Sequence, residues 1–229
     1  MSKQATDSIK AYSFADGISD FDVLFEIGNM GAGHAAKVLS DILHEPVMVE
    51  VPRLHLTEPH LVPQFFSKHD AIVAAVFMQL RDKPDCDVVL MLDAGEAEHI
   101  ATLMLSITES EQIDDEMKRS AVEELGSIMI CSFLNAIADF TLTELVPNPP
   151  QVIYDSFDAI LESFLVKQAL CSNLAVVFDT CFRRCGNSAE GCLIMFPSEE
   201  LRKTLINNGK RWLENLQDSK DKQDLNVKL

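Results

Sequence analysis

The chain has 229 residues and 47% apolar side chains, which suits one large globular domain or two small ones and excludes disorder as its main state. Its 19 basic and 36 acidic side chains give a net charge of −17 at pH 7, so nucleic acid and anionic membranes are disfavoured as partners. We expect a cytoplasmic protein, because no apolar run is long enough to insert into a membrane and the first residues lack a signal-peptide core.

Hydrophobic periodicity and turn signals predict helices and strands in alternation. We expect a loosely ordered leader at residues 1–18 and a mixed-charge tail at 217–229. The predicted elements between them are, in chain order, a helix at 19–43, a strand at 47–51, a short helix at 59–68, strands at 70–80 and 87–92, helices at 94–106 and 114–145, a strand at 151–155, a helix at 157–169, strands at 173–183 and 191–196, and a helix at 198–216.

The same order of elements occurs twice, and several residues match at an offset of 98 positions. These pairs are Glu26 and Glu124, Gly28 and Gly126, Asp41 and Asp139, and Pro52 and Pro150. We therefore predict a single α/β domain of the α+β type over 19–216, internally duplicated into halves at about 19–110 and 111–216. Strand pairs joined by tight turns predict a mixed or antiparallel sheet, on which the two long helices pack.

One face of the first long helix carries polar groups. At 100° per residue, Asp22, Glu26, Asn29 and Gly33 fall within about 60° of one another. Large apolar residues fall on the opposite side and predict the buried face; they are Leu24, Ile27, Val38 and Ile42.

Three glycines, Gly28, Gly31 and Gly33, lie in the middle of this helix, where each costs roughly 1 kcal/mol relative to alanine. Such a cost indicates that another helix or a partner approaches the helix surface closely. A simple solvated face with glycines that serve helix packing is the alternative. A phosphate-binding loop is disfavoured, because no strand precedes the glycines and their spacing is not G-x-G-x-x-G.

The spacing Asp22-x3-Glu26-x2-Asn29-x22-Pro52 resembles the signature of the CheC/CheX/FliY family of chemotaxis phosphatases. That signature is Asp or Ser, three residues, Glu, two residues, Asn, twenty-two residues and Pro, so this sequence matches it at every position. The duplicated architecture is most similar to CheC. CheX uses a single centre, and FliY-type proteins add a flagellar-switch domain, for which this sequence offers no spare segment of about 80 residues.

The second half carries an altered copy of the motif, Ser120-x3-Glu124-x2-Ser127-x22-Pro150. Here Ser127 occupies the position of the asparagine. The resemblance therefore implies that Glu26 and Asn29 are catalytic, with Asp22, Gly33 and Pro52 as supporting residues, and that the second site is degenerate.

The resemblance also implies the reaction, which is hydrolysis of the phospho-aspartate of the response regulator CheY. Asn29 would position the attacking water as glutamine does in small GTPases, and Glu26 would pair with the active-site lysine of the regulator. No cofactor or metal of its own is implied, because Mg²⁺ is expected on the regulator. The six cysteines lack paired metal-ligand spacing, and we expect buried, reduced thiols. The alternative is a non-catalytic binding or adaptation module that acts through the deamidase CheD or through the regulator.

Overall fold

The computed structural model describes residues 20–66, 70–81, 83–106, 113–168, 174–184 and 187–211, and the statements below concern this part of the chain. Its elements are α1 (Asp20–Leu43), β1 (Val47–Thr57), the 3-10 helix η1 (Pro59–Phe65), β2 (Ile72–Leu80), β3 (Lys83–Asp93), α2 (Ala94–Ser106), α3 (Asp115–Thr141), β4 (Gln151–Ser156), α4 (Phe157–Gln168), β5 (Ala175–Arg184) and β6 (Asn187–Phe196). Residues 199–211 form a further helix. The predicted leader and tail lie outside the described residues.

The six strands form one sheet in the order β1-β5-β6-β3-β2-β4, and every neighbouring pair is antiparallel. This order is symmetric between the two halves of the chain. If β1, β2 and β3 exchange names with β4, β5 and β6, the same order results when the sheet is followed from its other edge. The first strand of each triplet pairs with the second strand of the other triplet, so neither triplet forms a sheet of its own. The predicted α+β class is confirmed, with a wholly antiparallel sheet, while the boundaries of the two halves stay a prediction.

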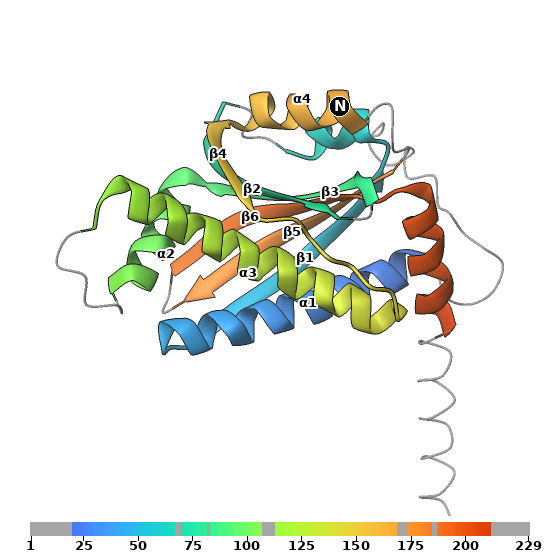
Figure 1. The fold of residues 1–229 in the computed structure, drawn as a ribbon, viewed down its shortest axis with the longest axis horizontal. Coiled ribbons are helices and arrows are strands. Elements are labelled where there is room, and N and C mark those ends of the chain that lie inside the picture. The colour runs from blue at the N-terminus through green and yellow to red at the C-terminus, as the bar shows by residue number, and fades with distance from the viewer. Residues whose placement is uncertain are drawn as a thin grey trace, which may run out of the picture.

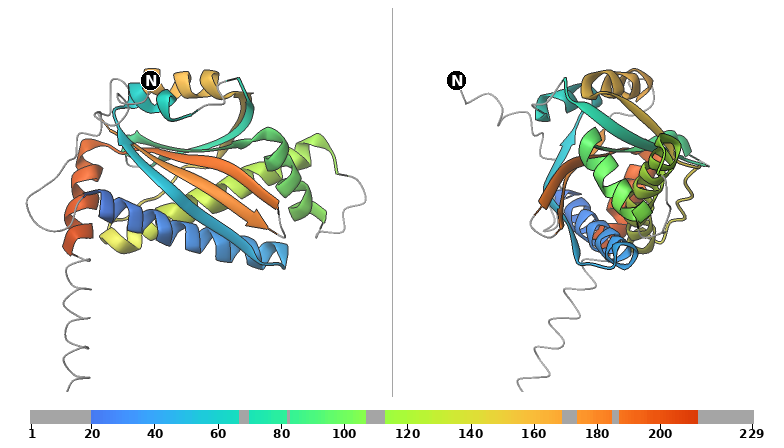
Figure 2. Two further views of the ribbon diagram at one scale, coloured as in Figure 1. Left: turned by 180° about the vertical axis from the view of Figure 1, so that it is seen from behind. Right: turned by 90° about the vertical axis from the view of Figure 1, so that its left-hand side faces the viewer.

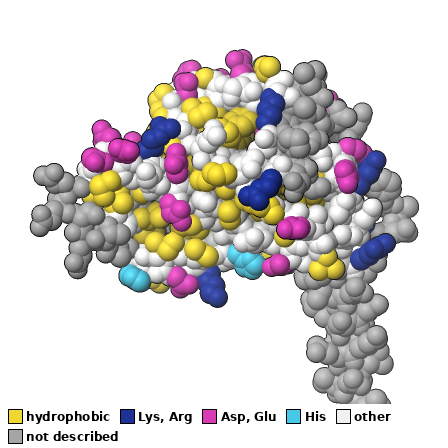
Figure 3. Space-filling view, viewed as in Figure 1, with side chains coloured by type: hydrophobic (Ala, Val, Ile, Leu, Met, Phe, Trp, Pro, Cys, Tyr) yellow, Lys and Arg dark blue, Asp and Glu magenta, His cyan; other side chains and the backbone are white. Residues whose placement is uncertain are grey.

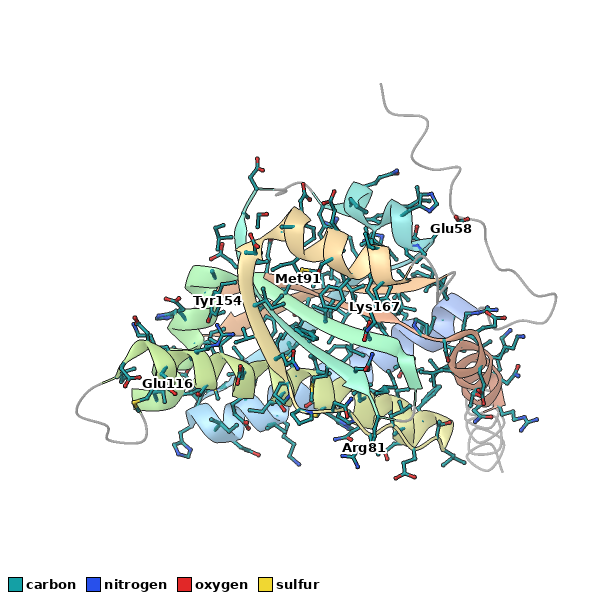
Figure 4. All side chains as sticks on the ribbon, turned by 45° about the horizontal axis from the view of Figure 1, so that its top comes forward. Glu58, Arg81, Met91, Glu116, Tyr154 and Lys167 are labelled. Atoms are coloured by element: carbon teal, nitrogen blue, oxygen red, sulfur yellow. The ribbon has the colours of Figure 1, made fainter. Side chains whose placement is uncertain are left out.

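Helices cover both faces of the sheet (Figures 1 and 2). The two long helices α1 and α3 lie side by side on one face, and α4 and η1 lie on the other. The larger hydrophobic cluster fills the space between the long helices and the sheet. A smaller cluster lies beneath α4 and includes Met91 of β3. Lys167, near the end of α4, reaches the buried carboxylate of Asp87 at 2.6 Å and so holds α4 on the sheet (Figure 4).

Among the described residues, α3 is the one helix that is long and apolar enough, over Asp115–Phe140, to cross a membrane by length and composition. However, 61% of its most apolar window is buried inside the structure. These side chains pack against α1, α2 and the sheet, so the apolar character of α3 serves the core.

Several predicted elements have different boundaries in the structure: β3 begins at Lys83 rather than 87 and β6 at Asn187 rather than 191, and two further differences have a clear physical reason. The first strand does not end at 51 but continues through Pro52 to Thr57, because β1 is an edge strand and its register shifts between Glu50 and Arg53, where a proline without an N–H is tolerated. The second long helix ends at Thr141 rather than 145, because Leu142 adopts the left-handed conformation with φ of 53°.

Candidate functional site

The polar face predicted on α1 is exposed in the structure. Asp22, Asn29 and Gly33 are exposed and Glu26 is half-buried, whereas Leu24 and Ile27 are buried against the core. Neither the Asn29 amide nor the Glu26 carboxylate forms a hydrogen bond or ion pair with another described residue. Both groups are therefore available to a partner.

The buried face of α1 is rotated relative to the prediction. Val38 was expected in the apolar stripe but is 39% exposed, and Ile42 is only half-buried. The buried face of α1 is instead formed in this region by Leu39 and by small residues that include Ala32 and Ala35. Small side chains allow the helix to lie close to the sheet and to α3, and this close approach determines which side faces inward.

The three glycines of α1 have two different roles. A Cβ atom on Gly28 would lie 2.8 Å from the ring of Phe178 in β5, and one on Gly31 would lie 2.7 Å from the ring of Phe133 in α3. These two glycines serve close packing, as the alternative interpretation held. A Cβ atom on Gly33 would meet nothing within 4 Å. Gly33 therefore leaves bare backbone on the surface, one helical turn after Asn29.

A hydrogen bond between Ser40 and β1 holds the C-terminal end of α1 in place. The hydroxyl of Ser40 donates to the carbonyl oxygen of Ala36 at 2.7 Å and accepts from the N–H of Val47 at 2.9 Å. Val51 lies under Gly28, with its Cγ1 3.6 Å from the position of a Cβ atom there. Pro52, the last residue of the motif, directly follows Val51, so the motif joins the helix to the strand beneath it.

The second copy of the motif lies on α3 and has the same packing. A Cβ atom on Gly126 would lie 2.4 Å from the side chain of Val76 in β2, as Gly28 approaches β5. Ser120 and Glu124 are exposed, Ser127 is half-buried, and Pro150 is half-buried just before β4.

The surface of this second copy is more filled than that of the first. Cys131 occupies the position that corresponds to Gly33, and its sulfur lies 4.0 Å from the hydroxyl oxygen of Ser127, within hydrogen-bond range for a thiol. Burial raises the pKa of the Cys131 thiol; the Ser127 hydroxyl opposes the rise and the Glu124 carboxylate adds to it. The hydroxyl at the asparagine position is thus occupied by a neighbouring side chain.

Sequence reasoning missed two cavities. One, of about 440 Å³, lies on the α4 side of the sheet and is lined by residues that include Phe65, Phe157, Arg53 and Asp179. The other, of about 600 Å³, lies between α2 and the start of α3 and is lined by residues that include Met104, Met117, Ser120 and Glu124. No local pattern marks either, because their walls come from segments far apart in the sequence.

Neither cavity includes Glu26, Asn29 or Gly33 in its walls. Small-molecule sites are concave, whereas these residues lie on the outer face of a helix. The polar face of α1 therefore suits a macromolecular partner. On the side of the molecule seen in Figure 3, acidic side chains are scattered over several elements rather than gathered in one patch.

In the described part of the chain, no three His, Cys, Asp or Glu side chains lie close enough together to hold a metal ion. The cysteines found there are free thiols, of which Cys86 and Cys192 are buried and Cys131 and Cys181 are half-buried. Cys171 and Cys185 lie outside the described residues.

No family model matches the chain. Over 173 residues the chain is 31% identical to the CheY-P phosphatase CheC of Bacillus subtilis (strain 168), a match that covers 73% of this chain and 83% of that protein. The fold is similar to that of FliY from Thermotoga maritima, with a TM-score of 0.67 and 23% identity over 87% of this chain and 100% of that one. It is also similar to the FliM middle domain from H. pylori, with a TM-score of 0.58 and 10% identity over 82% of this chain and 97% of that one. At such identities the two structural similarities concern the fold alone.

Proposed function

Because this chain belongs to the CheC family, we propose that it is a protein phosphatase that hydrolyses the phospho-aspartate of a CheY-type response regulator. The observation that carries the proposal is the exposed face of α1, where the Glu26 carboxylate and the Asn29 amide have no partner among the described residues. The activity in the name of the Bacillus subtilis relative supports the same reaction.

Asn29 is proposed to position the attacking water. An acyl phosphate already has a good leaving group, so the enzyme's main contribution is to hold a water in line with the phosphorus atom. The amide oxygen can accept a hydrogen bond from that water, while the amide NH₂ donates to a phosphoryl oxygen. A serine hydroxyl is shorter and lacks this two-ended geometry. The bare backbone at Gly33 supports the proposal, because it leaves room for the regulator beside the amide.

Glu26 is proposed to dock the regulator by pairing with its active-site lysine. Glu26 lies one turn before Asn29 on the same side of α1, so one regulator could contact both side chains. The Mg²⁺ ion that neutralises phosphoryl charge would be bound by the regulator. The residues of this chain would then bind, orient and position, and no nucleophile of their own is required.

The first site is proposed to be intact and the second to be degenerate. Ser127 replaces the asparagine and lies beside Cys131, which covers the position that Gly33 leaves bare. A serine hydroxyl must accept from the water and donate to the phosphoryl group through one oxygen on a short side chain, so it cannot span the distance between the two as the separate oxygen and NH₂ of an amide can. We therefore assign the turnover to the α1 site.

The direct test is to mix the purified protein with phosphorylated regulator and to measure phosphate release. Release well above the regulator's own rate supports the phosphatase. Binding of the regulator without faster release would reject it and favour a non-catalytic module; binding of CheD is the corresponding test for that alternative. Ser127 is the observation that favours the non-catalytic module as a second candidate, since one of the two copies of the motif lacks the amide.

Glu26→Gln is expected to weaken complex formation rather than the chemical step. Its proposed partner is a lysine on a partly exposed surface, where ionic strength screens the attraction. The KM for phosphorylated regulator should therefore rise at low salt, and the difference from wild type should shrink as salt is added. Glu124→Gln, at the matching position of α3, is the control and should change neither parameter. A large loss that is independent of salt would contradict the docking role.

A further inference from the structure

Phe21 and Phe25 lie on the same ridge of α1 as Asn29. Residues four apart form a continuous ridge on a helix, and the ridge through Asn29 consists of Phe21, Phe25, Asn29 and Gly33. The rings of Phe21 and Phe25 are stacked, with centroids 5.9 Å apart and planes at 9°. Phe25 is half-buried against the core, whereas Phe21 is 44% exposed. The ridge thus runs from an exposed aromatic side chain to the proposed water-positioning amide.

The matching ridge of α3 consists of Arg119, Glu123, Ser127 and Cys131. In place of the aromatic pair, Arg119 and Glu123 form an ion pair with 4.0 Å between Nε and Oε1. Arg119 also donates to the carbonyl oxygen of Val152 in β4. Ser127 and Cys131 contact each other, as described above. Every side chain of this second ridge therefore has a polar partner within the chain, and the half that lost the amide also lacks the aromatic pair.

A regulator bound at Asn29 is expected to reach Phe21. Eight residues separate the two, which corresponds to about 12 Å along the helix. A stable protein interface buries about 800 Å² on each partner, a patch roughly 30 Å across. An interface of this size centred on Asn29 extends about 15 Å along α1 in each direction and therefore includes the exposed ring of Phe21. A large aromatic side chain that becomes desolvated in an interface can supply a large share of its binding energy.

We propose that Phe21, held in place by its stack on Phe25, is the apolar anchor that selects the regulator at the α1 site. The inference rests on the proposed phosphatase function, because that function identifies what covers the ridge. The partner must then present an apolar surface patch about 12 Å from its phosphorylated aspartate. A regulator with a charged surface there is a poor substrate even when it is phosphorylated. Phe21 acts as a positioning and specificity residue, since it does not touch the reacting atoms.

Three substitutions at Phe21 test the proposal. Phe21→Ala removes the ring, Phe21→Arg introduces the residue of the matching α3 position, and Phe21→Leu keeps an apolar contact. Val166→Ala, at a 75% exposed position of α4 on the opposite face of the sheet, is the matched control. Two quantities are measured: KM and kcat for the phosphorylated regulator, and the Kd for regulator loaded with beryllium fluoride, a non-hydrolysable mimic of the acyl phosphate.

We expect the alanine and arginine variants to raise KM and Kd about tenfold while kcat stays within about twofold, the pattern of lost uniform binding. The leucine variant should stay within about threefold, and the control should be unchanged. A Kd and KM within about twofold of wild type for both Phe21→Ala and Phe21→Arg would overturn the anchor while leaving the phosphatase intact. A wild-type protein that binds the loaded regulator through Phe21 without hydrolysing phosphate would instead overturn the function and support the anchor. No binding by the wild type would overturn both.

Discussion

Asn29→Ala is expected to abolish nearly all phosphate release from the phosphorylated regulator while the fold stays intact. The side chain is exposed and has no hydrogen bond to a described residue, so its removal leaves no cavity and no unpaired group. Loss of the contact that orients the attacking water should raise the barrier by about 2–4 kcal/mol, by analogy with a lost oxyanion-hole donor. This corresponds to a decrease in kcat of about thirtyfold to several hundredfold.

Ser127→Ala provides the matched control, since it removes the side chain at the same position of the second motif. It should leave kcat close to wild type, because the second site is assigned little turnover. Single-turnover release of phosphate measures the chemical step, and the Kd for beryllium-fluoride-loaded regulator shows whether binding is kept. Near wild-type release by Asn29→Ala would reject the water-positioning role, and a large loss in Ser127→Ala would reject the one-site assignment.

Much of the fold could be predicted from the sequence because its signals are local. The apolar periodicity after Asp20 and the proline at 46 predicted α1 almost to its last residue. The matching spacing of the two motifs indicated that the two long helices occupy corresponding places in the two halves of a duplicated fold. Strand pairs joined by tight turns predicted a mixed or antiparallel sheet, but the interleaving of β1 with β5 and of β2 with β4 has no local signal. Pairing between strands that lie more than 70 residues apart in the sequence is decided by packing.

The polar residues of the candidate site could be predicted from the sequence, but how far the site extends along α1 could not. The 100° period places Asp22, Glu26 and Asn29 on one face whatever lies beneath the helix. Phe21 lies outside this stripe and was not recognised, because its role depends on its exposure and on its stack with Phe25.

The glycines of α1 show the same limit more sharply. The helical period placed Gly33 on the polar face, but the sequence did not show what approaches Gly28 and Gly31. The roles of the three glycines differ because Phe178 and Phe133 lie against the latter two, and both aromatic residues belong to the second half of the chain. The period can separate a glycine on the exposed face from one on the buried face, but the side chain that a buried glycine accommodates cannot be identified without those distant neighbours.

Alanine substitutions at Gly31 and Gly33 are therefore expected to have opposite effects on stability. In a helix interior, alanine is favoured over glycine by about 1 kcal/mol, and Gly33→Ala should gain this amount because its Cβ atom meets nothing within 4 Å. At Gly31 the Cβ atom would lie 2.7 Å from the ring of Phe133 and 2.9 Å from its Cα. Rotation of the Phe133 ring cannot remove the clash between the new Cβ atom and the Phe133 Cα atom. The helices α1 and α3 must therefore move apart. The overpacking should outweigh the propensity gain and lower the free energy of unfolding by about 2 kcal/mol.

Urea unfolding of the two variants measures this difference, and the phosphatase assay then separates packing from docking. Gly33→Ala should be more stable than wild type yet bind the regulator less tightly, because a methyl group projects from the backbone that the regulator approaches beside Asn29. A stabilised protein with impaired binding is not explained by damage to the fold. Gly31→Ala should lose stability, with little change in Kd at temperatures where it stays folded, since its Cβ atom points toward α3 and not toward the regulator. Equal and unaltered binding by both variants would mean that the bare surface at Gly33 is not part of the docking face, and the regulator would then have to approach α1 from the side of Phe21 alone.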